Sequence, residues 1–174
     1  YPPGSTWKMV VALAALEAGL LDPKETVFCN GRLRLGDRYF HCWRWGGHGH
    51  VALHESLSES CDVYYYEMAR RVGIDAISAM ARRLGLGVRH ELPLPAVREG
   101  LAPTRDWKLG ARGEAWLVGD TFNAGIGQGF VLASPLQLAV MTARLATGRA
   151  VAPRLVRAAA GRPLPDPEPP PLDV

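Results

Sequence analysis

The first eight residues, YPPGSTWK, constrain this chain most, because they fix where its first helix begins. The Pro-Pro-Gly segment disfavours helical structure, whereas residues 9–20 (MVVALAALEAGL) are strong helix formers. Ser5 is therefore expected at or near a helix N-terminus, with Lys8 about one turn later on the same face. This pair has two interpretations: a capping serine beside a surface lysine, or a nucleophile beside its base.

The chemical interpretation rests on what a Ser-x-x-Lys pair needs. A serine hydroxyl is a poor nucleophile unless a base takes its proton. A lysine three residues on in a helix brings its amine near the serine oxygen, and in a desolvated site that amine can serve as the base. The helix N-terminus also offers unpaired N–H groups and positive potential, which suit a developing oxyanion.

Size and composition exclude several classes of protein. The chain has 174 residues, enough for one compact domain, and its 48% hydrophobic and 21% charged residues are typical of a folded globular protein. The net charge is +3 and no basic run stands out, so we expect no nucleic-acid partner. The longest apolar stretch is interrupted by Glu17 and is too short to span a bilayer.

Helical patterns dominate the chain. We expect helices at residues 9–20, 53–57, 63–72 and 74–84, and a last helix that Ser134-Pro135 opens and Gly148 ends. The stretches 22–54 and 88–120 are expected to be irregular, and the Gly-rich NAGIGQGF to form a tight turn. Residues 1–160 would form the domain, and residues 161–174 a Pro-rich extended tail.

Four potential metal ligands lie in or next to the first irregular stretch: Cys29, Cys42, His48 and Cys61. They form the spacing C-x12-C-x5-H-x12-C and the ligand set of a closed structural zinc site, which would staple a long loop. A Cys29–Cys42 disulfide with Cys61 buried is one alternative, and three unrelated thiols another. His41, His50 and His54 compete with His48 as the fourth ligand.

Three segments resemble the penicillin-binding transpeptidases. YPPGSTWK resembles the turn that introduces their nucleophile, and Ser60-Cys61-Asp62 resembles their Ser-x-Asn motif. GIGQGFVLASPLQLA resembles their Gly-x-Gly-Gln-Gly turn and the Ser/Thr-Pro-x-Gln helix after it. The aspartate at position 62 and WGGHGHV before it resemble the class B D,D-transpeptidases of the penicillin-binding protein 2 group. The resemblance covers about residues 1 to 156.

The resemblance implies roles for four residues. Ser5 would be the nucleophile that attacks the D-Ala-D-Ala carbonyl of a peptidoglycan stem peptide, and Lys8 its general base. Ser60 would relay a proton between Lys8 and the leaving amine, and Asp62 would hydrogen-bond near the substrate or Lys8. Ser60 and Asp62 also suit helix caps, a role compatible with catalysis. No organic cofactor is expected.

The family's third motif, Lys-(Ser/Thr)-Gly on a strand of the site, does not occur in the sequence. We therefore expect the chain to be the α-dominated part of an α+β transpeptidase domain, with most of the central antiparallel sheet outside it and little turnover alone. The alternatives are a serine β-lactamase or β-lactam sensor domain, or a non-catalytic, zinc-stapled interaction domain.

The resemblance also implies partners and a location. β-Lactams would acylate Ser5 as substrate mimics, and elongation-complex membrane proteins such as a lipid II polymerase would be protein partners. The domain would lie at the periplasmic face of the bacterial inner membrane, anchored by a segment upstream of this chain.

Overall fold

The computed structural model describes residues 1–165 and 168–173. Its helices are the short 3-10 helix η1 (Gly4–Trp7), α1 (Lys8–Glu17), α2 (Leu53–Ser58), α3 (Asp62–Val72), α4 (Ile74–Arg83), α5 (Arg105–Arg112), α6 (Val118–Gly125) and α7 (Pro135–Thr147). Its strands are β1 (Val27–Cys29), β2 (Arg32–Leu35), β3 (Arg38–His41), β4 (Gly49–Val51), β5 (Ala158–Ala159) and β6 (Arg162–Pro163). Helices therefore dominate the described chain, as expected.

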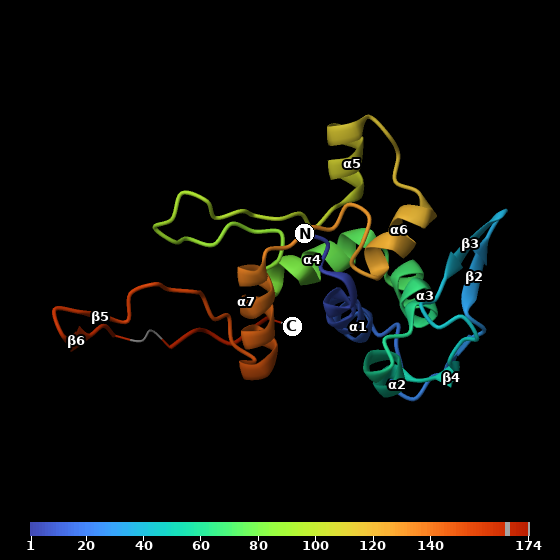
Figure 1. The fold of residues 1–174 in the computed structure, drawn as a ribbon, viewed down its shortest axis with the longest axis horizontal. Coiled ribbons are helices and arrows are strands. Elements are labelled where there is room, and N and C mark those ends of the chain that lie inside the picture. The colour runs from blue at the N-terminus through green and yellow to red at the C-terminus, as the bar shows by residue number, and fades with distance from the viewer. Residues whose placement is uncertain (166–167, 174) are drawn as a thin grey trace.

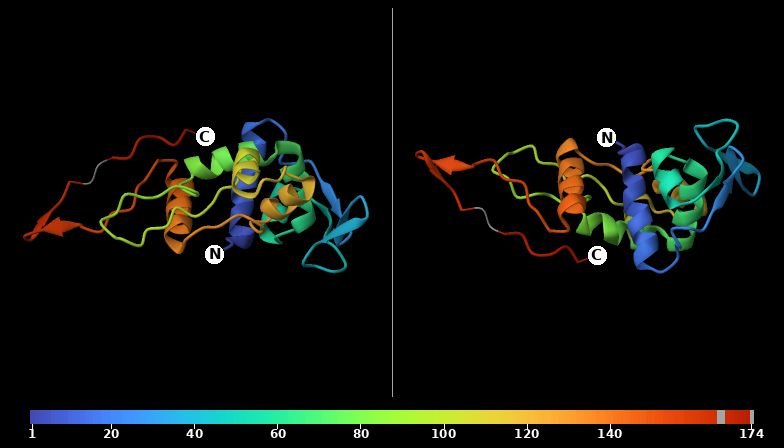
Figure 2. Two further views of the ribbon diagram at one scale, coloured as in Figure 1. Left: turned by 90° about the horizontal axis from the view of Figure 1, so that it is seen from above. Right: turned by 90° about the horizontal axis from the view of Figure 1, so that it is seen from below.

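Helix α1 lies at the centre of the molecule (Figures 1 and 2), with α3 and α4 packed against it. Its sequence KMVVALAALE is apolar on nearly every side, a pattern typical of a helix that is buried all round. Val10, Val11 and Ala15 are fully buried. This burial fixes the direction of the turn that carries Ser5 and Lys8 at the start of α1.

Helix α6 packs along α3 through a glycine. A Cβ atom added to Gly125 would lie 2.6 Å from the Cβ atom of Ala69 and 3.0 Å from the carbonyl oxygen of Tyr65, both on α3. The two backbones can approach this closely only because Gly125 has no side chain. Phe122, one turn earlier, fills the core beside this contact and is 1% exposed.

The stretch 22–54 is more ordered than the sequence suggested. It forms two two-stranded antiparallel sheets, in which β1 pairs with β4 and β2 with β3. The β2–β3 hairpin projects from the body beyond α3 (Figure 1). The expectation of an irregular stretch was wrong here, because strands of three or four residues separated by glycines are too short to show alternation.

The expectation of loops over residues 88–120 was also partly wrong, because α5 and the start of α6 lie there. Thr104 caps α5 by accepting a hydrogen bond from the Trp107 N–H, and Gly113 ends the helix in the left-handed conformation. The sequence of α6, VGDTFNAG, has weak helix propensity, so its helix depends on packing against α3 rather than on local preference.

Helix α7 has the predicted ends. Ser134 accepts a hydrogen bond from the Gln137 N–H, the Gln137 side chain bonds back to the Ser134 N–H, and Gly148 ends the helix with φ +62°. The small β5–β6 hairpin lies across the predicted division at residue 160, with β5 before it and β6 in the tail. Residues 166, 167 and 174 lie outside the described residues, and the division at residue 160 stays a prediction. None of the helices within residues 1–165 and 168–173 could cross a membrane.

Candidate active site and metal centre

Ser5 lies in the first turn of η1, which runs directly into α1. The backbone N–H of Gly4 donates a hydrogen bond of 3.0 Å to the carbonyl oxygen of Gly127. Gly127 has φ +69°, and a Cβ atom there would lie 2.2 Å from the Gly4 carbonyl oxygen. The Gly-rich turn thus supports the segment that carries Ser5, and Trp7 packs beneath it, 1% exposed.

The four residues predicted to be catalytic lie together. Lys8 Nζ donates three hydrogen bonds: 2.6 Å to Asp62 Oδ1, 2.9 Å to Ser60 Oγ and 2.8 Å to the Ser60 carbonyl oxygen. Ser60 Oγ in turn donates to Ser5 Oγ at 2.8 Å. A continuous hydrogen-bonded path therefore joins Lys8 to Ser5 through the hydroxyl of Ser60, which is the geometry a proton relay needs.

The ion pair at the centre of this path is shielded from solvent. The Lys8 side chain is 1% exposed and that of Asp62 13%. Burying a lysine is costly unless its donors are satisfied, and here each of the three ammonium protons has an acceptor. The interpretation of Lys8 as a surface lysine was therefore wrong: Lys8 is buried and held in place beneath Ser5.

Ser60 reaches Ser5 because of an unusual backbone conformation. Its φ of +54° is in the left-handed region, which residues other than glycine adopt only where their surroundings hold them. Ser60 ends the turn between α2 and α3, and Cys61 is the N-cap residue of α3. The expectation that Asp62 is itself the cap was wrong, because it is the first helical residue and its carboxylate is bound to Lys8.

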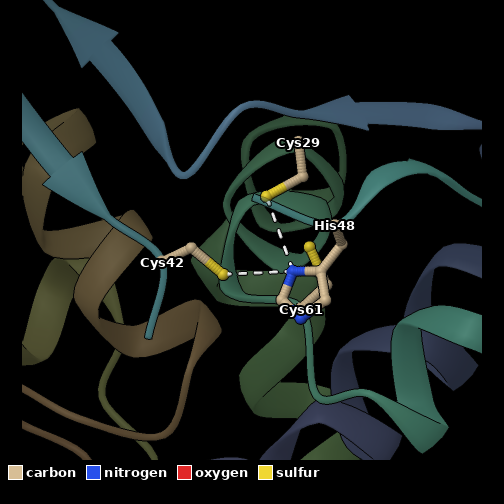
Figure 3. Close-up of side chains that lie close together, drawn as sticks. All are labelled: Cys29, Cys42, His48 and Cys61. Atoms are coloured by element: carbon tan, nitrogen blue, oxygen red, sulfur yellow. Dashed lines mark hydrogen bonds between the residues drawn. The ribbon is translucent and has the colours of Figure 1, made fainter. Parts of the chain in front are cut away.

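The predicted metal ligands also lie together (Figure 3): the ligand atoms of Cys29, Cys42, His48 and Cys61 are all within 4.8 Å of one another. Cys29 comes from the end of β1, Cys42 follows β3, and Cys61 precedes α3. Three segments distant in the sequence therefore converge on the imidazole of His48. All three cysteines are free thiols in the structure, so Cys29 and Cys42 form no disulfide.

Two of the distances among these ligand atoms match those expected around a tetrahedral zinc ion. Bond lengths of about 2.3 Å to sulfur and about 2.0–2.1 Å to nitrogen place the two ligand atoms about 3.6 Å apart in a tetrahedron. The distances from His48 Nδ1 to the sulfurs of Cys29 and Cys42 are 3.6 and 3.5 Å. A neutral imidazole nitrogen can accept a hydrogen bond from only one of the two thiols, so Nδ1 cannot satisfy both sulfurs. A cation bound by the nitrogen and both sulfurs would satisfy all three atoms.

The other ring nitrogen of His48 supports the same assignment. His48 Nε2 is buried and has no hydrogen-bond partner among the described residues, and it lies 3.8 Å from the carboxylate of Glu59. Metal-bound histidines commonly direct their second ring nitrogen at a carboxylate. The competing histidines lie elsewhere: His41 stacks on Trp45, His50 contacts Phe28 and His54 is exposed.

Burial raises the pKa of the Cys61 thiol, and the sulfurs of Cys29 and Cys42 beside it add to the shift. Without a cation this thiol therefore stays protonated at neutral pH. A divalent cation would favour the thiolates and offset their mutual repulsion.

One residue of the site went unnoticed in the sequence. The Trp43 N–H donates a 2.9 Å hydrogen bond to Asp62 Oδ2, and its indole N–H lies 3.1 Å from the Ser60 carbonyl oxygen. The only sequence signal is that Trp43 directly follows Cys42, one of the predicted metal ligands.

Comparison with known proteins agrees with this geometry. Residues 1–172 match the family described as Penicillin binding protein transpeptidase domain. The chain belongs to this family. The resemblance to the class B penicillin-binding protein 2 group is confirmed by the Peptidoglycan D,D-transpeptidase MrdA of Acinetobacter baumannii, 40% identical over 164 residues, which cover 92% of this chain and 24% of that protein.

Solved transpeptidase structures show the same fold. Penicillin-binding protein 2 of Pseudomonas aeruginosa, in complex with WCK 5153, superposes with a TM-score of 0.90 at 41% sequence identity. The aligned region covers 100% of this chain and 40% of the Pseudomonas chain. Penicillin-binding protein 2 of Helicobacter pylori, in a complex with MreC, gives 0.87 at 35% identity, over 95% of this chain and 31% of its own. The chain is thus an α-dominated part of the family's fold, about a quarter of the length of its MrdA relatives.

Proposed function

We propose that the full-length protein is a peptidoglycan D,D-transpeptidase that cross-links stem peptides during cell-wall elongation through an acyl-enzyme on Ser5. The path from Lys8 through Ser60 to Ser5 carries this proposal, and the name of the MrdA relatives supports it. We further propose the location stated above, at the periplasmic face of the inner membrane, and partners among membrane proteins of the elongation complex. The Helicobacter pylori complex with MreC supports a partner of that kind.

The reaction begins with attack of Ser5 Oγ on the carbonyl carbon of the penultimate D-Ala. For this step Lys8 must be neutral: its two N–H groups then keep the hydrogen bonds to Asp62 Oδ1 and the Ser60 carbonyl oxygen, and its lone pair faces the Ser60 hydroxyl. The Ser60 hydroxyl gives its proton to the Lys8 amine and takes the proton of Ser5 in its place. The carbon–nitrogen bond to the terminal D-Ala then breaks, and the leaving amine takes the proton back by the same path. The backbone N–H of Ser5, in the first turn of η1, would supply one half of the oxyanion hole.

The second half of the reaction uses the same groups. An acceptor amine from a neighbouring strand attacks the ester carbon, its proton goes through Ser60 and Lys8, and Ser5 leaves with that proton. A β-lactam would acylate Ser5 in the same way, because its amide bond stands in for the D-Ala-D-Ala bond. Its reaction would stop at this first half. The 174 residues contain no Lys-(Ser/Thr)-Gly, so we propose that the chain by itself turns over little.

Labelling with a fluorescent penicillin tests the function. The full-length protein should be labelled with one equivalent, and Ser5→Ala should not be labelled. Thr6→Ala should be labelled normally, because among the described residues the Thr6 hydroxyl bonds only the Pro3 carbonyl oxygen. Unchanged labelling of Ser5→Ala would reject Ser5 as the nucleophile and favour a non-catalytic domain. Rapid hydrolysis of the labelled ester would favour a β-lactamase instead.

We also propose that Cys29, Cys42, His48 and Cys61 hold a structural zinc ion. Such an ion would supply no step of the reaction and would join β1, the segment after β3 and the start of α3. Elemental analysis should find about one zinc per chain, lost in Cys61→Ala. A metal-free protein with a Cys29–Cys42 linked peptide in mass spectrometry would contradict this assignment.

A further inference from the structure

Trp43 connects the cysteine–histidine cluster to the residues around Ser5. It directly follows Cys42, and its ring lies edge-on to that of His48, with 5.5 Å between the ring centroids. Trp43 is nevertheless 65% exposed, so most of its indole lies outside the core. Packing in the core therefore does not explain why this large, exposed aromatic residue is held in one orientation.

Hydrogen bonds hold this orientation at both ends of the residue. The backbone N–H of Trp43 donates to Asp62 Oδ2 at 2.9 Å, while Asp62 Oδ1 accepts from Lys8. The carboxylate is thus bound on both oxygens and cannot rotate away from Lys8. The indole Nε1–H lies 3.0 Å from the carbonyl oxygen of Glu59 and 3.1 Å from that of Ser60.

These two carbonyl groups belong to the turn that presents the Ser60 hydroxyl. Ser60 has φ +54°, and its carbonyl oxygen also accepts from Lys8 Nζ at 2.8 Å. A serine in the left-handed region relaxes unless its neighbours hold it, and the indole N–H is one of the groups that do so. If the turn relaxed, the Ser60 hydroxyl would leave the position 2.8 Å from Ser5 Oγ.

We propose that Trp43 is a positioning residue for acylation of Ser5, acting through its indole N–H on the Ser60 turn and its backbone N–H on Asp62. This inference rests on the proposed function, because it concerns the rate at which Ser5 is acylated. It assigns no chemistry to Trp43 itself. The donor N–H of the indole, rather than its bulk, is the group that matters.

The neighbouring Trp45 offers a matched control. It is 85% exposed and stacks on His41, and its indole makes no hydrogen bond within the described residues. In the full-length protein, Trp43→Phe should lower the maximal rate of acylation by a fluorescent penicillin about tenfold. Its apparent binding constant, melting temperature and zinc content should stay unchanged, and Trp45→Phe should leave the acylation rate unchanged.

An acylation rate of Trp43→Phe equal to that of Trp45→Phe would overturn the inference. If Trp43→Phe lowers the melting temperature as well, benzothienylalanine at position 43 keeps the bicyclic shape and removes only the N–H donor. A native rate with this residue would overturn the inference, and a similar loss would support it. Ser5→Ala in the same series separates the two proposals, because labelling of that variant would instead reject the proposed function.

Discussion

At the scale of single residues, the buried Lys8–Asp62 pair fixes the Lys8 amine at the start of the hydrogen-bonded path to Ser5. The pair lies 2.6 Å apart and almost out of contact with water, so each charge depends on the other. The spacing of three in a helix predicts that Lys8 lies near Ser5 but leaves a surface lysine as the alternative, and the role of Lys8 as a base is implied by the family resemblance. Asp62 could be assigned only through the family resemblance. Trp43 could not be assigned at all, because its contacts with Asp62 and Ser60 form only when folding brings Cys42 and Cys61 together.

Lys8→Met keeps the length of the side chain and removes its charge. We expect no acylation by penicillin, and a loss of roughly 3 kcal/mol of stability because Asp62 is left with an uncompensated charge. Thermal and urea unfolding of the full-length protein would measure the second effect.

The double variant Lys8→Met/Asp62→Asn separates the two roles of the pair. It should regain much of the lost stability, because no charge remains buried, and it should still not be acylated. Recovery of acylation in the double variant would show that Lys8 is not the base.

At the scale of the secondary-structure elements, some elements are determined by local sequence signals and others by tertiary packing. The start and end of α7 follow from Ser134-Pro135 and Gly148, because caps are local chemistry. Helix α6 and the short strands β1 to β4 could not be predicted, because their stability comes from contacts with α3 and from pairing between segments. The metal-ligand set could be proposed from the spacing, although the choice of His48 needed the sheet register.

The contact between α3 and α6 is tested by two glycine substitutions. Gly125→Ala should destabilise the protein by about 1–3 kcal/mol, because the new methyl group overlaps Ala69 and the Tyr65 backbone. Gly110→Ala in α5, where nothing lies within 4 Å, should stabilise by about 0.5–1 kcal/mol through helix propensity alone. Equal effects on the melting temperature would contradict the packing of α6 described above.

The segment after α4 makes stability depend on pH through His90. Burial lowers the pKa of His90, the cation of Arg144 lowers it further, and His90 Nε2 lies 3.0 Å from the Gly85 carbonyl oxygen. The folded state therefore holds His90 neutral while the unfolded state takes up a proton as the pH falls below about 6.5.

The free energy of unfolding should consequently fall with acidification through that range. His90→Gln, which cannot titrate, should show a smaller fall between pH 7.5 and pH 5.5 (about one unit either side of the ordinary histidine value) in urea unfolding. An identical pH dependence of the two proteins would contradict this role of His90.

At the scale of the whole molecule, the proposed metal site and the proposed nucleophile are held in place by the same segments. Cys42 and Trp43 are neighbours in sequence, as are Ser60, Cys61 and Asp62, so each pair or triplet serves both sites. Removing zinc with a chelator should therefore lower the melting temperature and the acylation rate together. Cys61→Ala should already have a low melting temperature and a low acylation rate, and the chelator should change neither. A chelated protein with native stability would contradict the structural role of the zinc ion.

Every proposed step of the reaction depends on the acylation of Ser5. It is tested most directly by digesting the full-length protein after reaction with a penicillin and locating the adduct by peptide mass spectrometry. We expect one adduct, on the peptide that contains Ser5, and none in Ser5→Ala. An adduct on another residue, or one that persists in Ser5→Ala, would contradict it.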